Sequence, residues 1–89
     1  MEIITKTRFE KDIKKLKKRR KDFTKLEKVI CDLVAGIKLD DKYKNHPLVG
    51  NWQPCWELHI EPDWLLIYFI DKDKGQLILY RTGTHSDLF

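Results

Sequence analysis

The first part of the chain carries apolar residues at helical spacing. Phe9, Ile13 and Leu16 form a single apolar stripe, whereas the other faces of the same stretch are almost entirely basic. Thr7 followed by Glu10 has the spacing of a capping box, which is typical of a helix start. The pattern therefore predicts a first helix that opens at Thr7 and buries one narrow face.

A wider apolar face follows after a few polar residues. Asp22 or Thr24 is suited to cap this second helix at its start, and Gly36 is suited to end it. The apolar positions are Leu26, Val29, Ile30, Leu33, Val34 and Ile37. Because so few residues separate the two patterns, they predict an α-hairpin.

Strand patterns come before and after the helices. The candidate strands are residues 2–5, the alternating run 55–60, the continuously apolar run 64–70 and the run 76–82. Residues 40–51 have few periodic apolar positions and are predicted as loop. The order is β-α-α-β-β-β. We expect an α+β fold in which the helical hairpin packs on one face of a mainly antiparallel sheet.

Two hairpins bring polar residues to one end of this sheet. A two-residue loop at Glu61–Pro62 places His59 opposite Trp64, and a five-residue loop over residues 71–75 brings Arg81 to the same end. The gathered set is His59, Asp63, Trp64 and Arg81, with His85 just beyond and His46 in the preceding loop. In this register Arg81 lies on the face opposite His59, and a bulge or a one-residue slip would reverse that.

Length and composition predict a single domain over residues 1–89. Of the 89 residues, 42% are apolar and 36% charged, which is a globular balance. No stretch approaches the roughly 20 apolar residues of a membrane span, and the charged N-terminus does not resemble a signal peptide. We therefore expect a cytoplasmic protein with no membrane partner. Cys31 and Cys55 have no recognisable spacing and are expected to be free, buried thiols.

Positive charge is concentrated in the N-terminal half. Residues 1–44 hold 15 Lys and Arg against 8 Asp and Glu, whereas residues 45–89 hold 3 against 6. One short run contains Lys14, Lys15, Lys17, Lys18, Arg19, Arg20 and Lys21. Because like charges at this density repel one another, we interpret the run as a surface for a polyanion. A solvated helix face is the alternative.

The gathered side chains suit phosphoryl transfer from an RNA 2′-hydroxyl. That reaction needs a base, an acid and a cation that stabilises the charge on phosphorus. Imidazoles titrate near neutral pH and can serve as base or acid, and the rings of Trp64 and Phe89 can stack on bases. Each residue also has an ordinary interpretation, such as Arg81 pairing with Asp63 or Trp64 lying in the core. A metal site made from two histidines and Asp63 matches no standard zinc spacing.

Three blocks of the second half resemble the YafQ-type toxins of the RelE superfamily. They are residues 43–52 (YKNHPLVGNW), 59–68 (HIEPDWLLIY) and 81–89 (RTGTHSDLF), in the order found in the family. The last block follows the family ending Arg-x-Gly-(Ser/Thr)-His-(Ser/Ala)-x-Leu-Phe. Trp56 departs from the pattern, because relatives usually carry arginine there.

This resemblance implies a RelE-like fold and the toxin of a type II toxin–antitoxin pair. It implies mRNA cleavage in the A site of the 70S ribosome, without a metal or cofactor, that leaves a 2′,3′-cyclic phosphate. The implied partners are a neutralising DinJ- or RelB-like antitoxin, operator DNA reached only through that antitoxin, and ribosomal RNA for the basic run.

The resemblance also implies a set of site residues. They are His46, His59, Asp63, Trp64, Arg81, His85 and Phe89. We expect His85 to be the general acid and Arg81 to stabilise the phosphate. The base is left open among the other two histidines and Asp63.

Two other functions belong to different classes. The same superfamily contains ParE-like toxins that bind DNA gyrase and are not nucleases, and a plain RNA-binding module would explain the basic run. The histidine cluster favours the nuclease, because neither alternative needs acid–base groups.

Overall fold

A computed structural model describes residues 1–89, which begin with a short strand and two helices, β1 (Glu2–Thr5), α1 (Thr7–Lys18) and α2 (Phe23–Ala35). Lys6 is the N-cap of α1 and provides no side-chain cap. The capping box predicted at Thr7 is therefore wrong, because Thr7 already lies inside the helix. Glu10 instead accepts a hydrogen bond of 2.8 Å from the hydroxyl of Thr5.

The second helix is capped at both ends as predicted. The carboxylate of Asp22 accepts the backbone N–H of Thr24 at 3.0 Å. Gly36 has a φ of 71°, a left-handed conformation that glycine adopts without steric cost. Ile37 follows this cap and is 58% exposed, so it does not belong to the buried face to which its spacing had assigned it.

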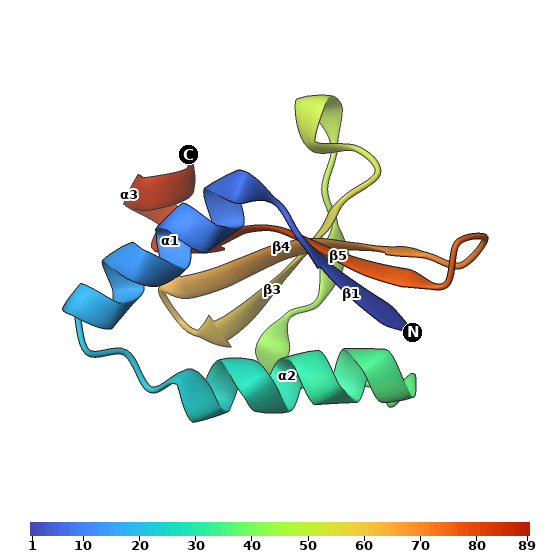
Figure 1. Ribbon diagram of the computed structural model, residues 1–89, viewed down its shortest axis with the longest axis horizontal. Helices are drawn as coiled ribbons and strands as arrows, with labels where there is room; N and C mark the ends of the chain where they lie inside the picture. The colour runs from blue at the N-terminus through green and yellow to red at the C-terminus, as the bar shows by residue number, and fades with distance from the viewer.

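Five strands form one mixed sheet in the order β1-β5-β4-β3-β2 (Figure 1). Antiparallel hairpins join the three long strands, β3 (Trp56–Glu61), β4 (Trp64–Asp71) and β5 (Gln76–Gly83). β1 pairs with β5 in parallel, and β2 (His46–Pro47) pairs with the free edge of β3. The predicted α+β class with a mainly antiparallel sheet is confirmed.

Sequence patterns missed four short elements. β2 and the 3₁₀ helices η1 (Asp41–Tyr43) and η2 (Gly50–Trp52) lie in the stretch predicted as loop, and α3 (His85–Leu88) follows β5. Each has at most four residues, which is too short for a hydrophobic period to appear. α3 matters for the site, because His85 is its first residue.

The hairpin registers differ from the predicted ones. Glu61 pairs with Trp64 across a Pro62–Asp63 turn, and a bulge lies between His59 and Glu61. The second loop has four residues, since Asp71 pairs with Gln76, and a further bulge shifts the end of β5. A bulge adds an unpaired residue and re-aims the side chains beyond it. The polar residues still meet at one end of the sheet, but their faces differ from the predicted ones. Arg81 lies on the same face as His59, and Trp64 lies on the opposite face, in the larger core.

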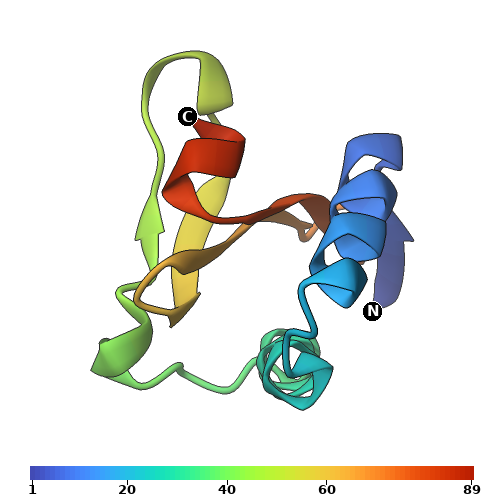
Figure 2. The ribbon, with the colours of Figure 1, turned by 90° about the vertical axis from the view of Figure 1, so that its left-hand side faces the viewer.

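Different segments cover the two faces of the sheet. α1 and α2 pack over the larger core, which includes Leu58 and Leu66 of the strands. The opposite face carries a smaller core with Cys55 and Leu88, and Figure 2 shows α2 and α3 on opposite sides of the strands. Cys55 is buried as predicted, whereas Cys31 is exposed. None of the helices has the length and apolar character that crossing a membrane requires.

Candidate active site

Three histidines lie together on the sheet face that α1 and α2 leave free. His46 belongs to β2, His59 to β3, and His85 opens α3. The ring centres of His46 and His59 are 6.5 Å apart, and those of His59 and His85 are 5.7 Å apart. Strand alternation turns His59 to this face, because its neighbours Leu58 and Ile60 pack under the helices. The structure thus brings together three imidazoles that are distant in the sequence.

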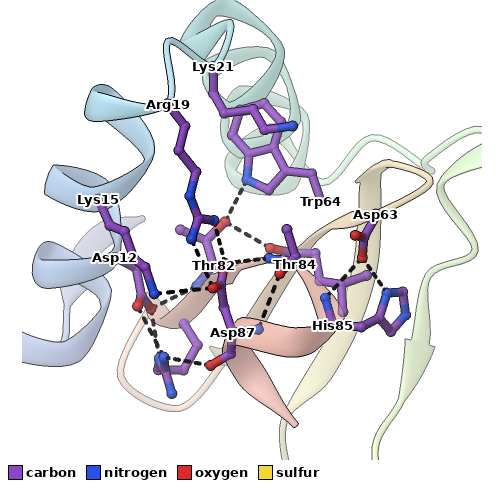
Figure 3. A network of polar contacts seen from close by, with 12 residues as sticks. Asp12, Lys15, Arg19, Lys21, Asp63, Trp64, Thr82, Thr84, His85 and Asp87 are labelled. Atoms are coloured by element: carbon purple, nitrogen blue, oxygen red, sulfur yellow. Dashed lines mark hydrogen bonds and ion pairs between the residues drawn. The ribbon is translucent and has the colours of Figure 1, made fainter.

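Asp63 holds His85 in place (Figure 3). Oδ1 of Asp63 lies 2.6 Å from Nδ1 of His85 and also accepts the backbone N–H of His85 at 2.9 Å. The backbone hydrogen bond, and next the ring hydrogen bond, lower the pKa of Asp63, so this side chain is a carboxylate at neutral pH. A carboxylate on Nδ1 orients the ring and leaves Nε2 available to a substrate.

The other two histidines have different partners. Nδ1 of His59 lies 3.2 Å from the carbonyl oxygen of Pro62, which leaves Nε2 free. His46 faces an acceptor on each side, the carbonyl of Lys44 at 2.6 Å from Nδ1 and the carboxylate of Glu57 at 3.1 Å from Nε2. It can donate to both only when the ring carries two protons. His46 therefore has no free ring nitrogen, whereas His59 has one.

Asp87 fixes the short helix that carries His85. Asp87 Oδ2 accepts the backbone N–H of Thr84 at 2.9 Å, and Thr84 Oγ1 accepts the backbone N–H of Asp87 at 3.2 Å, which completes a capping box. Lys15 of α1 and Arg19, the residue that caps its end, donate to the same carboxylate, the guanidinium at 2.7 and 3.1 Å (Figure 3). Asp87, which sequence reasoning did not select, thus ties α1 to the helix that presents His85.

The stabilisation provided by Asp87 should depend on pH. The hydrogen bond from Arg19 is the largest cause that lowers the pKa of Asp87, well below the ordinary value of about 3.9. A carboxyl whose pKa is lower in the folded state stabilises the fold above its unfolded pKa, and this contribution is lost as the pH falls towards the folded value. We expect the free energy of unfolding to fall between about pH 5 and pH 2, and to fall less in Asp87→Asn. Urea denaturation at a series of pH values measures both, and equal slopes would rule out this role for Asp87.

Arg81 lies against α1. Its Nε and Nη2 donate to the carboxylate of Asp12 at 2.7 and 3.1 Å, and the same carboxylate accepts the backbone N–H of Thr82 at 3.1 Å. Both members of the ion pair are 11% exposed. The suggested pairing of Arg81 with Asp63 is therefore wrong, because Asp12 binds the guanidinium and Asp63 binds His85 instead. Nη1 is the one guanidinium nitrogen without a protein partner.

The two aromatic residues predicted to stack on bases have different surroundings. Trp64 is 0% exposed; its indole N–H donates to Oγ1 of Thr82 at 2.9 Å, and Phe23 packs against it edge-on. The predicted stacking role of Trp64 is therefore wrong, because neither face of its ring reaches solvent. Phe89 is 62% exposed and touches Trp52 edge-on, so one of its faces can receive a base.

The basic run in and just after α1 divides into paired and unpaired cations. Lys15 and Arg19 bind Asp87, and Lys21 binds the carboxylate of Glu61 at 3.2 Å. The exposed members without a carboxylate partner are Lys14, Lys17, Lys18 and Arg20. The surface that offers unpaired charge to RNA is thus narrower than the sequence suggested, and its contact with ribosomal RNA stays a prediction.

The alternative of a metal site requires a set of ligand side chains that lie close together. No group of three or more His, Cys, Asp or Glu side chains is arranged to hold a metal ion. Asp63, the carboxylate of the suggested site, is hydrogen-bonded to His85 instead.

Comparison with known proteins extends the resemblance over the whole chain. A family model for the bacterial toxin of type II toxin-antitoxin systems, YafQ, matches residues 1–89. The chain is 43% identical over 83 residues to the mRNA interferase toxin YafQ of Escherichia coli K12, a match that covers 91% of this chain and 87% of that one.

Two solved structures have the same fold. The E. coli DinJ–YafQ complex contains a chain with a TM-score of 0.89 and 39% identity, and the match covers 99% of this chain and 97% of that one. A metal-bound toxin from Helicobacter pylori gives a TM-score of 0.94 and 43% identity, over 100% of this chain and 99% of that one.

Proposed function

Because this chain belongs to the YafQ family of bacterial type II toxins, we propose that it is an endoribonuclease that cleaves mRNA on the ribosome by acid–base catalysis. The observation that carries the proposal is the pair His59 and His85. Their ring centres lie 5.7 Å apart, and each ring keeps one nitrogen free of protein partners. Transfer of a phosphoryl group to a 2′-hydroxyl requires one base and one acid.

His59 is the base in this proposal. The carbonyl of Pro62 keeps a proton on Nδ1, so Nε2 accepts the proton of the 2′-hydroxyl while its oxygen attacks phosphorus. His46 fits this role less well, because both of its nitrogens are occupied. Asp63 fits less well because its lowered pKa makes it a weak base at neutral pH. Of the three candidates left open by the sequence, His59 has the best support.

His85 is the acid. Its Nε2 gives a proton to the 5′ oxygen as the bond from phosphorus to that oxygen breaks, and Asp63 on Nδ1 stabilises the charge of the ring that holds the proton. One product ends in a 2′,3′-cyclic phosphate and the other in a 5′-hydroxyl, so this step consumes no water. Arg81 stabilises the phosphate through its remaining Nη1, and Phe89 stacks on a neighbouring base.

The proposal includes the partners and the location of the toxin. A DinJ-like antitoxin neutralises it, as suggested by its similarity to the YafQ chain of the DinJ–YafQ complex, and operator DNA is reached only through that antitoxin. Residues 1–89 act as one toxin domain in the cytoplasm, where ribosomes are found. The four unpaired cations of the basic run contact phosphates of ribosomal RNA, and these contacts provide affinity that does not depend on the RNA sequence.

We expect rapid cleavage of mRNA bound to 70S ribosomes and negligible cleavage of the same RNA in free solution. The unpaired cations of the basic run suit docking on ribosomal RNA, and the ribosome then positions the strand at the histidines. A 2′-deoxynucleotide on the 5′ side of the cleaved bond should abolish cutting, whereas a chelator selective for transition metals should not slow it. The measurement is a gel of labelled mRNA with and without ribosomes. Cleavage of the deoxy substrate would exclude the 2′-hydroxyl mechanism, and rapid cutting of free RNA would exclude ribosome dependence.

A further inference from the structure

A second basic region lies beside the histidines and is separate from α1. A pocket of about 570 Å³ opens between α2, η1 and the end of β3. Four lysines line it, Lys25, Lys28, Lys42 and Lys44, and His59 is among the other residues of its lining. The pocket therefore reaches the residue that carries the proposed catalytic base.

The charge of this pocket is only partly compensated by the protein. Glu61 is the one carboxylate in its lining, and it is already bound to Lys25 at 2.7 Å and to Lys21 at 3.2 Å. Lys28 pairs with Asp32 on its own helix. Lys42 and Lys44 are exposed and have no carboxylate partner, so the unpaired charge comes from η1 and the residue that follows it. Two unpaired ammonium groups in a hollow attract an anion.

The backbone holds these two lysines in a defined place. Asp40 caps η1 by accepting the backbone N–H of Lys42 at 2.9 Å, and the ammonium of Lys42 lies 5.2 Å from the centre of the Tyr43 ring. Lys44 ends η1 with a left-handed φ of 48°, and its carbonyl oxygen binds Nδ1 of His46. The residue that supplies a cation to the pocket thus also supports a histidine of the site.

We propose that this pocket binds a phosphate of the substrate RNA strand next to the scissile phosphate, with Lys42 and Lys44 as its ligands. The inference rests on the proposed nuclease function. Phosphates recur at every nucleotide, so a strand held at His59 presents its next phosphate to the neighbouring pocket. Ammonium groups bind the phosphate charge and do not distinguish one base from another. This contact therefore positions the strand without specifying its sequence.

The test uses a short RNA with a 2′-deoxynucleotide at the cleavage position, which binds without being cut. Its affinity for the toxin is measured by fluorescence anisotropy at several salt concentrations. Lys42→Ala/Lys44→Ala is compared with Lys72→Ala/Lys74→Ala, a control of equal charge on the exposed turn between β4 and β5. We expect the pocket variant to bind roughly tenfold more weakly, as loss of a charge-assisted contact predicts. The slope of log affinity against log salt should become shallower by about 0.7 for one lost phosphate contact on a single strand, whereas the control should keep the wild-type slope.

Further measurements separate this phosphate from other anions. NMR titration with the same RNA should shift resonances of His59, Lys42 and Lys44, and shifts confined to α1 would overturn the proposal. Equal weakening by the pocket and control variants would also overturn it. If the pocket variant binds RNA normally but loses affinity for ribosomes lacking mRNA, the ligand is ribosomal RNA; if it loses affinity only for antitoxin, the ligand is an acidic protein surface, and either result overturns the proposal. A wild-type toxin that binds the RNA in this pocket but never cuts mRNA would instead disprove the nuclease function alone.

Discussion

Replacing His85 by alanine should lower the rate of mRNA cleavage by roughly 10²–10⁴-fold, which is the usual contribution of one acid–base group. The free energy of unfolding should change by less than about 1 kcal/mol. The ring is 55% exposed, and the backbone N–H of residue 85 still donates to Asp63 after the substitution. Single-turnover cleavage of ribosome-bound mRNA at saturating toxin measures the rate, and thermal melting measures the stability.

His59→Ala is the matched comparison, because it removes the proposed base from the same cluster. An acid must be protonated to act and a base must be deprotonated, so the two variants should differ in their pH profiles. The variant without His85 should lose the fall in rate at high pH, and the variant without His59 should lose the fall at low pH. A His85 variant that cuts within threefold of wild type would remove this residue from the mechanism. A variant that does not fold would make it a structural residue.

The long elements could be predicted from the sequence because each repeats a pattern over several turns or residue pairs. α2 has a wide apolar face and a glycine cap, and β4 is continuously apolar up to Ile70. The same apolar run indicated that β4 is covered on both faces. A strand covered on both faces leaves no ring exposed for stacking on a base, and Trp64, the first residue of β4, is indeed fully buried.

The face on which each site residue lies could not be predicted, because it depends on bulges that leave no mark in the sequence pattern. One extra residue in β5 pairs Arg81 with Ile67, on the face of the smaller core where His59 also lies, and the guanidinium reaches Asp12 of α1 beyond the end of β1. The pairing joins residues 69 positions apart, and no local pattern reports such a distance. Asp87 is different, because Thr84 and Asp87 have capping-box spacing. That signal was present in the sequence and predicts the short helix that presents His85.

Replacing Asp12 by alanine should cost about 3–5 kcal/mol, the usual loss when one partner of a buried ion pair is removed. Asp12 is buried and accepts hydrogen bonds from the guanidinium of Arg81 and from the backbone N–H of Thr82. The substitution leaves a guanidinium and an amide without their acceptor between α1 and β5. Since small domains are stable by only about 5–15 kcal/mol, much of the fold's stability depends on this carboxylate. Urea denaturation of wild type and variant measures the loss.

The double variant Asp12→Ala/Arg81→Met separates the cost of an unpaired charge from the value of the pair. Replacing both members of a buried ion pair by apolar side chains is often close to neutral, so the double variant should be more stable than Asp12→Ala alone. Asp12→Asn, which keeps an acceptor for Thr82, provides a milder change if Asp12→Ala does not fold. A loss below about 1 kcal/mol for Asp12→Ala would show that the pair is not a structural anchor. If the double variant folds normally but cleaves slowly, the loss of rate comes from the missing guanidinium and not from a disturbed fold. That result would assign Arg81 to the phosphate.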